Sequence, residues 1–313
     1  MSDVYTTEVL GRIEAAKTLT ARLPDLKVQA QRIAANVMLG VHGLRKAGPG
    51  ENFWQFRPYV PGEPAKQIDW RRSALSESTL FVREREWSTS QSVWLWADLS
   101  TSMNFRSHLA SVSKIDRAVV LLLGLAELLG RGGERVGIPG IAPARLGRNG
   151  ADRLAKVIAQ AGVTDDWPDF TKVGKYSSVV IISDFLMDME TLRERLKSLT
   201  VRGVEVTMLQ VFDPVEESFP YDGRAEFRDP ETGDLWLTEH ASGLRGEYRA
   251  RIAAYRAMIR EVARPAGFSF AVHHTDRPAS EALLMLTSRL SGAILSDFHS
   301  GQMGLPKQER PAA

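Results

Sequence analysis

Three oxygen-bearing side chains follow a short apolar segment, and their types and spacing are typical of a cation site. Residues 93–97 are wholly apolar, and Asp98, Ser100 and Ser102 come after them at alternate positions. A run that is apolar on both faces predicts a strand buried on both sides. Where the chain leaves such a strand, one carboxylate and two hydroxyls can turn toward one point. This set of oxygens suits Mg²⁺ or Mn²⁺, with water filling the other positions.

A second carboxylate follows a second apolar segment further along the chain. Residues 178–183 read Ser-Val-Val-Ile-Ile-Ser, and Asp184 comes directly after them. The carboxyl ends of parallel strands share one edge of a sheet, and ligand sites gather there where the strand order reverses. We therefore expect Asp184 to join Asp98, Ser100 and Ser102 in one metal site, directly or through a water. The simpler alternative is that Asp98 and Ser100 only cap a turn.

The elements that must position these side chains alternate between apolar and amphipathic segments. Strands are predicted at residues 93–97, 135–138, 178–183, 204–212 and 268–273. Helices are predicted at residues 113–130, 151–161, 189–199, 244–262 and 280–290. Buried strands that alternate with amphipathic helices favour an α/β fold, with a mostly parallel sheet covered by helices.

The predicted organisation has four parts along the chain. They are an N-terminal helical arm at 1–45, a loop and strand segment at 46–89, an α/β domain at 90–298 with a hairpin insertion at about 213–242, and a disordered tail at 299–313. Pro24 is expected to break the arm into two helices. The arm either binds a partner or packs on the main domain, and we favour packing.

Composition and charge restrict the function classes. The 313 residues suffice for one large α/β domain with additions, and the net charge of +2 gives no overall attraction to nucleic acid or anionic membrane. The absence of cysteine excludes disulfides, thiolate metal sites and cysteine nucleophiles. Residues 1–21 lack the apolar core of a secretory signal, and the longest apolar run, 118–126, is too short to span a bilayer. We expect a cytoplasmic protein with no integral membrane segment.

The D-x-S-x-S loop that begins at Asp98, together with Asp184, resembles the metal-ion-dependent adhesion site of von Willebrand factor A domains. The resemblance implies a von Willebrand A-like, Rossmann-like fold and a Mg²⁺ or Mn²⁺ site completed by a partner carboxylate. Those domains also use a threonine from an intervening loop. No threonine occurs between Ser102 and Thr164, so that ligand is missing or replaced. The metal is then expected to bind at low occupancy until a partner supplies its own ligand.

A second pattern precedes this loop. It consists of GENFWQFRPYVPGE at 50–63, IDWRRSA at 68–74 and LFVRE at 80–84. In this order the segments resemble the signature of the domain-of-unknown-function 58 family (DUF58), with Glu63 in place of the usual aspartate and Pro64-Ala65-Lys66 in place of an arginine-bearing link. The resemblance implies a non-enzymatic adaptor with a chaperone-like role that works beside a MoxR-type AAA+ ATPase.

Residue chemistry allows two alternative functions. Asp98 could accept a phosphoryl group beside Mg²⁺ as a phosphatase or phosphotransfer enzyme does, but Ser100 stands where such loops carry their second, acid–base carboxylate. Arginines and tryptophans between residues 57 and 87 could stack on nucleic acid, but their segment has a net charge of only +1. We favour an internal network there, in which Arg57 and Asp69 stabilise the fold. A surface or capping role is expected for His273-His274.

Overall fold

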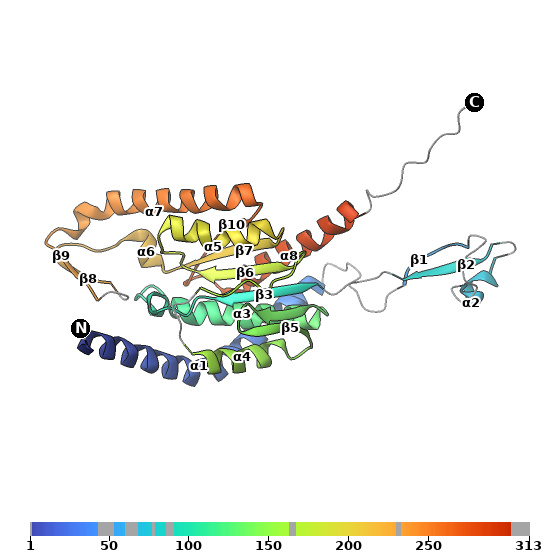
Figure 1. Cartoon of the computed structure of the whole chain (residues 1–313), viewed down its shortest axis with the longest axis horizontal. Coiled ribbons are helices and arrows are strands. Elements are labelled where there is room, and N and C mark those ends of the chain that lie inside the picture. The colour runs from blue at the N-terminus through green and yellow to red at the C-terminus, as the bar shows by residue number, and fades with distance from the viewer. Residues whose placement is uncertain are drawn as a thin grey trace, which may run out of the picture. The chain divides into compact units, whose positions relative to one another are not determined.

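The computed structural model describes residues 2–42, 53–59, 68–76, 79–85, 91–162, 167–229 and 233–301. The chain forms two compact units, one from residues 1–43 and 91–313 and the other from residues 44–90. Figure 1 labels the elements of both units.

A six-stranded sheet forms the centre of the larger unit. Its strands are β3 (Ser92–Ala97), β4 (Arg135–Ile138), β5 (Ala142–Leu146), β6 (Ser178–Ser183), β7 (Glu205–Phe212) and β10 (Ser269–His274). They lie in the order β10-β7-β6-β3-β4-β5. Every neighbouring pair is parallel except β4 and β5, which are antiparallel. The predicted α/β fold with a mostly parallel sheet is confirmed.

The strand order reverses between β3 and β6. From β3 the chain adds β4 and β5 on one side and then crosses to add β6, β7 and β10 on the other. Asp98 follows β3 and Asp184 follows β6. These carboxylates therefore stand at the point where ligands bind in open α/β sheets.

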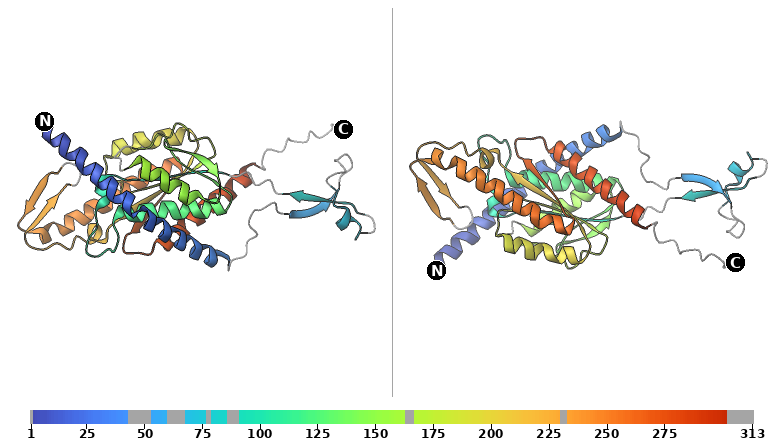
Figure 2. Two further views of the ribbon diagram at one scale, coloured as in Figure 1. Left: turned by 90° about the horizontal axis from the view of Figure 1, so that it is seen from below. Right: turned by 90° about the horizontal axis from the view of Figure 1, so that it is seen from above.

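Helices cover both faces of this sheet. They are α1 (Ser2–His42), α3 (Lys114–Arg131), α4 (Gly150–Ala161), α5 (Met189–Val201), α6 (Pro214–Ser218), α7 (Ala241–Ala263) and α8 (Ala279–Gly301), with short 3₁₀ turns at Thr101–Asn104 and Arg264–Ala266. Figures 1 and 2 show α5 and α7 on one face and α1, α3 and α4 on the other. Helix α8 packs against α3 and α1.

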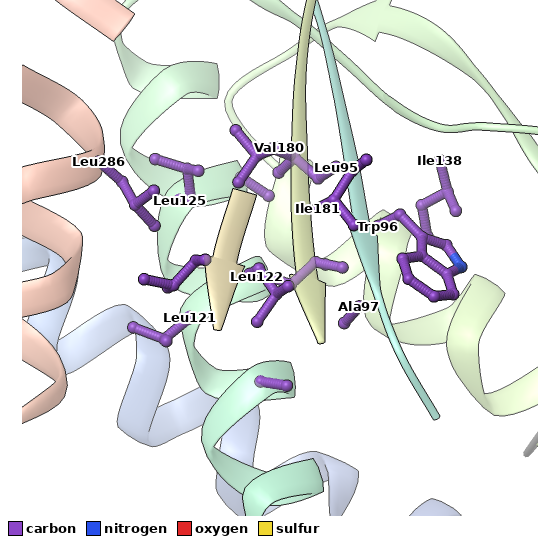
Figure 3. Close-up of a cluster of buried hydrophobic side chains, with 14 of the residues drawn as sticks. Leu95, Trp96, Ala97, Leu121, Leu122, Leu125, Ile138, Val180, Ile181 and Leu286 are labelled. Carbon is purple, nitrogen blue, oxygen red and sulfur yellow. The ribbon is translucent and has the colours of Figure 1, made fainter. Parts of the chain in front are cut away.

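Helix α3 is buried on nearly all sides, which places it at the centre of the core. Figure 3 shows its Leu122 and Leu125 beside Val180 of β6, with Leu286 of α8 next to Leu125. A Cβ atom added at Gly124 would lie 2.8 Å from Leu283 of α8. Glycine at this position therefore allows the two helices to approach closely.

Pro24 does not divide α1, so the prediction of two helices was wrong. The helix runs from Ser2 to His42 with Pro24 inside it. Leu23 and Leu26, on either side of the proline, are both buried in the common core. Burying a leucine contributes about 1.5–3 kcal/mol, so packing on both sides offsets the roughly 3 kcal/mol that an interior proline costs.

Replacing Pro24 with alanine is expected to raise the free energy of unfolding by about 1–3 kcal/mol, because alanine restores an N–H donor and removes the ring clash. The proline itself is exposed, so no packing is lost. Urea denaturation followed by circular dichroism measures the change. Thr20→Ala, at an exposed position one turn earlier, is the control. A Pro24→Ala protein less stable than wild type would contradict the explanation.

The smaller unit is described only in part. Strands β1 (Phe53–Pro58) and β2 (Phe81–Arg85) pair antiparallel. Asp69 caps the short helix α2 (Trp70–Ser73) by accepting the backbone N–H of Arg72 at 2.9 Å. The predicted internal network that includes Arg57 and Asp69 involves a side chain, that of Arg57, outside the described residues.

In the larger unit the edge strand β5 and the five-residue helix α6 were not predicted, and in the smaller unit β1 and α2 were not predicted. The predicted hairpin is confirmed as β8 (Ala225–Arg228) paired with β9 (Leu235–Thr238). Helix α8 extends to Gly301, well past the predicted end at residue 290, and residues 302–313 lie outside the description. In the described part of the chain no helix has the length and apolar character needed to cross a membrane.

Candidate functional site

Asp98 is buried and is held by both carboxylate oxygens. Its Oδ1 accepts the backbone N–H of Ser100 at 2.9 Å, and its Oδ2 accepts the hydroxyl of Ser183 at 2.6 Å. Ser183 is the last residue of β6, so the second bond ties the ends of the two central strands together. Burial and the nearby charge of Asp184 raise the pKa of Asp98. The alternative of a turn-capping role is therefore confirmed for Asp98, and the capping bond fixes the direction of the carboxylate.

The two serine hydroxyls lie together at the start of the turn after β3. Ser100 precedes the 3₁₀ turn but makes no side-chain capping bond. Its Oγ instead lies 3.1 Å from the Oγ of Ser102. The capping alternative thus does not account for the Ser100 hydroxyl, which remains directed toward Ser102.

Asp184 is also buried, and its carboxylate has two partners. Oδ1 accepts the backbone N–H of Leu186 at 3.1 Å, and Oδ2 accepts a hydrogen bond from Lys114 Nζ at 2.9 Å. The backbone carbonyl of Asp184 accepts a bond from Gln210 at 2.7 Å. The position of Asp184 is therefore fixed by three contacts from three parts of the fold.

All four predicted site residues line one cavity, here called the acidic pocket, of about 310 Å³. Its wall includes two tryptophans, Trp96 and Trp167, whose ring centroids lie 4.9 Å apart. The other lining residues are Leu186, Met187, Asp188, Thr191 and Arg195. The expected convergence of carboxylates and hydroxyls at one edge of the sheet is thus present in the structure.

Lys114 is the site residue that sequence reasoning missed. It is the first residue of α3 and is 1% exposed. Its Nζ donates to Asp184 at 2.9 Å and to Glu216 of α6 at 2.8 Å. Burial acts to lower the pKa of Lys114, but the charges of Asp184 and Glu216 raise it above its usual value. The side chain is therefore an ammonium ion, and its partners are too distant in sequence for any local signal.

The oxygens of the acidic pocket fit a hard divalent cation in type and in one spacing. Neighbouring oxygens around a cation with bonds of about 2.1 Å stand about 3 Å apart, close to the 3.1 Å between the serine hydroxyls. Among the described residues no group of three or more His, Asp or Glu side chains could hold a metal ion. The fit therefore depends on the hydroxyls as well as the carboxylates. Thr164 lies outside the description, but Thr191 of α5 adds a threonine to the pocket wall.

A second cavity, here called the aromatic pocket, adjoins the first. It measures about 300 Å³ and shares Ser102 and Leu186 with the acidic pocket. Five aromatic residues line it, namely Phe105, Phe219, Tyr221, Phe227 and Tyr248. Lys114 and Glu216 also lie in its wall. The Lys114 ion pair therefore separates the two pockets.

A family model described as "Protein of unknown function DUF58" matches residues 55–258. The chain belongs to this family. The match covers the predicted signature from residue 55 onward and continues through β9 into α7, which confirms the family that the sequence resembled.

Among curated relatives of this DUF58 chain are uncharacterized proteins of Mycobacterium bovis and Mycobacterium tuberculosis. Each is 28% identical over 305 residues, which cover 91% of this chain and 93% of the relative. Solved structures similar to it include the conserved hypothetical protein BatB from Bacteroides thetaiotaomicron, at 18% identity and a TM-score of 0.38, covering 65% of this chain and all of that one. An aerotolerance-related membrane protein from Bacteroides fragilis matches at 20% identity and a TM-score of 0.37, covering 62% of this chain and 96% of that one.

The histidine pair of this DUF58 protein lines neither pocket. His274 Nε2 lies 3.1 Å from Glu217, which also pairs with Arg256. His273 is buried, and its Nε2 has no hydrogen-bond partner among the described residues. The expected surface or capping role was therefore wrong for His273. The reason is that His273, near the end of β10, is buried, and burial together with the charge of Arg117 lowers its pKa.

Proposed function

We propose that this DUF58 protein is a cytoplasmic, non-catalytic adaptor with a von Willebrand factor A-like domain that binds its partner at the acidic pocket. The observation that carries the proposal is the convergence of Asp98, Ser100, Ser102 and Asp184 on one cavity at the reversal of strand order. Ligands of α/β sheets gather at such a point. The antiparallel strand β5 at one edge and the D-x-S-x-S loop after β3 support the von Willebrand A-like assignment.

In this proposal Asp98, Ser100, Ser102 and Asp184 hold a Mg²⁺ or Mn²⁺ ion. When bound, the ion supplies an open coordination position for a carboxylate of the partner. The chain itself orients the ligands in advance, because Ser183 fixes Asp98 and the backbone N–H of Leu186 fixes Asp184. A non-catalytic role is supported by Ser100, whose hydroxyl faces another hydroxyl rather than a group that could move protons.

The aromatic pocket defines what surrounds that carboxylate. Since the two cavities share Ser102 and Leu186, a segment that places a carboxylate in one places its neighbouring side chain over the other. Aromatic walls favour a large apolar side chain there. We therefore propose that the partner presents an acidic residue next to a large apolar one. By family resemblance the partner class is a MoxR-type AAA+ ATPase.

A binding titration with a co-encoded MoxR-type ATPase tests this function. With nucleotide held constant, Ser100→Ala/Ser102→Ala and chelation of divalent cations are each expected to weaken binding about tenfold or more, because each removes a charge-assisted contact. Isothermal titration calorimetry measures the affinity in Mn²⁺ and in chelator.

Ser198→Ala is the matched control for that titration, since Ser198 is exposed on α5 and lines neither pocket. It should leave affinity unchanged. An affinity for the ATPase that changes neither on chelation nor in Ser100→Ala/Ser102→Ala would overturn the proposed metal bridge.

A further inference from the structure

Lys114 stands where a lysine is unfavourable for two reasons. A buried ammonium loses its hydration. The first residue of a helix also lies at the positive end of the helix dipole. Yet Lys114 begins the eighteen-residue α3 and is almost fully buried. Its two ion pairs offset these costs, and they place a fixed positive charge against Asp184, one of the three carboxylates that line the acidic pocket.

The second partner, Glu216, is held rigidly in place. Its Oε2 accepts the backbone N–H of Asp213 at 2.8 Å, which leaves Oε1 for Lys114 at 2.8 Å. Asp213 is fully buried and caps α6 through Val215, and it also accepts the backbone N–H of Ser107 at 2.9 Å. Glu216 can therefore retain the ammonium of Lys114 when Asp184 binds a divalent cation instead.

The charge on Lys114 acts against a metal ion at the same carboxylate. With Lys114 in place, one ammonium lies against the carboxylates of both Asp184 and Glu216, so a cation that approaches Asp184 meets a positive charge already there. A divalent cation at Asp184 would be repelled by the ammonium at short range, in a buried region where water screens poorly.

We infer that Lys114 is a built-in competitor of the divalent cation, which it excludes from Asp184 until the ammonium is held by Glu216 alone. The inference rests on the proposed function and adds its regulation. Since Lys114 and Glu216 line the aromatic pocket, a partner seated there contacts the ion pair that controls the metal. Partner and metal then bind with positive coupling, and each raises the affinity for the other by the same factor.

Mn²⁺ binding to the isolated protein, measured by electron paramagnetic resonance of the free ion, tests the inference without a partner. Lys114→Met removes the charge and keeps the length of the side chain, so Mn²⁺ affinity should rise about tenfold or more. Glu216→Gln removes the alternative partner of the ammonium, so affinity should fall. In the Lys114→Met background, Glu216→Gln should change Mn²⁺ affinity less than it does in wild type, because no ammonium is then present for Glu216 to retain.

Arg193→Met is the control for total charge, because Arg193 is an exposed α5 residue paired with Glu190. It should leave the Mn²⁺ affinity unchanged. The inference is overturned if Lys114→Met binds Mn²⁺ no more tightly than wild type, or if Arg193→Met tightens binding equally. If Lys114→Met does not fold by circular dichroism, unchanged affinity in Glu216→Gln overturns it instead. Failure of the proposed function is a separate result, in which these changes occur but the ATPase binds regardless of Ser100 and Ser102.

Discussion

In the absence of divalent cations, Lys114→Met is expected to be less stable than wild type by about 3–5 kcal/mol of unfolding free energy. The reason is that the carboxylates of Asp184 and Glu216 lose the ammonium that they share. Both ion pairs are short, and Lys114 and Asp184 are almost fully buried. The pairs are therefore weakly screened by water, unlike those on the surface. Urea denaturation in the presence of chelator measures the loss.

Two comparisons separate this effect from a general effect of losing a lysine. Lys27→Met breaks a partly exposed pair with Asp152 and should cost at most about 1 kcal/mol. Glu216→Gln added to Lys114→Met should recover part of the loss, because it removes one of the two unpaired charges. Equal losses in the Lys27 and Lys114 proteins would contradict the role assigned to burial.

The second large effect is expected in mild acid and arises from His273. Burial first, and then the charges of Arg117 and His274, lower the pKa of His273 to about 3. In the unfolded chain the same ring takes a proton near its ordinary pKa of about 6.5. The contribution of the neutral His273 ring to the free energy of unfolding is therefore complete above pH 6.5, and it is lost as the pH falls toward 3. At pH 5 the loss is about 2 kcal/mol.

The neighbours of His273 determine this direction. Arg117 of α3 donates to the backbone carbonyl of Thr275 at 2.8 Å and also interacts with the charge of Asp276. His274 lies beside Glu217. Among the described residues, the causes that shift the pKa of His273 are burial and the charges of Arg117 and His274, with no carboxylate, so protonation of the buried ring is opposed rather than assisted.

Urea denaturation at pH 7.5 and pH 5 measures the acid effect. His273→Leu should reduce the difference in unfolding free energy between the two pH values by about 2 kcal/mol. His108→Leu, which removes an exposed histidine, should leave the difference as in wild type. A His273→Leu protein with the same acid sensitivity as wild type would show that another group titrates.

Apolar strands and their common edge were predictable from sequence because their signal is local. The run before Asp98 and the run before Asp184 have no polar face, and parallel pairing brings their ends to one edge. β5 was missed because its sequence, Ala-Pro-Ala-Arg-Leu, lies at the sheet edge and is largely exposed. For α6 a signal existed, since Asp213 and Glu216 have the spacing of a capping box around Pro214.

Long-range effects account for the remaining differences. The local rule that disfavours proline inside a helix predicted a break at Pro24. The contacts of α1 with α3, α4 and α8 outweigh that local cost. Lys114 reaches Asp184 and Glu216, which are 70 and 102 residues away along the chain. Only the folded topology brings such charges together, so a single lysine at the start of a helix gave no sign of its role.

The close approach of α8 to Gly124 of α3 has a consequence for how the protein is made. On a ribosome, α3 emerges well before Leu283, the residue that covers Gly124. At about 5–20 residues per second, the intervening chain takes roughly 8–30 s to synthesise. Throughout that interval the apolar side of α3 lacks one of its covering helices. Until translation reaches α8, this apolar surface of the nascent chain is open to non-native contacts, which makes the interval the stage at which aggregation competes with folding.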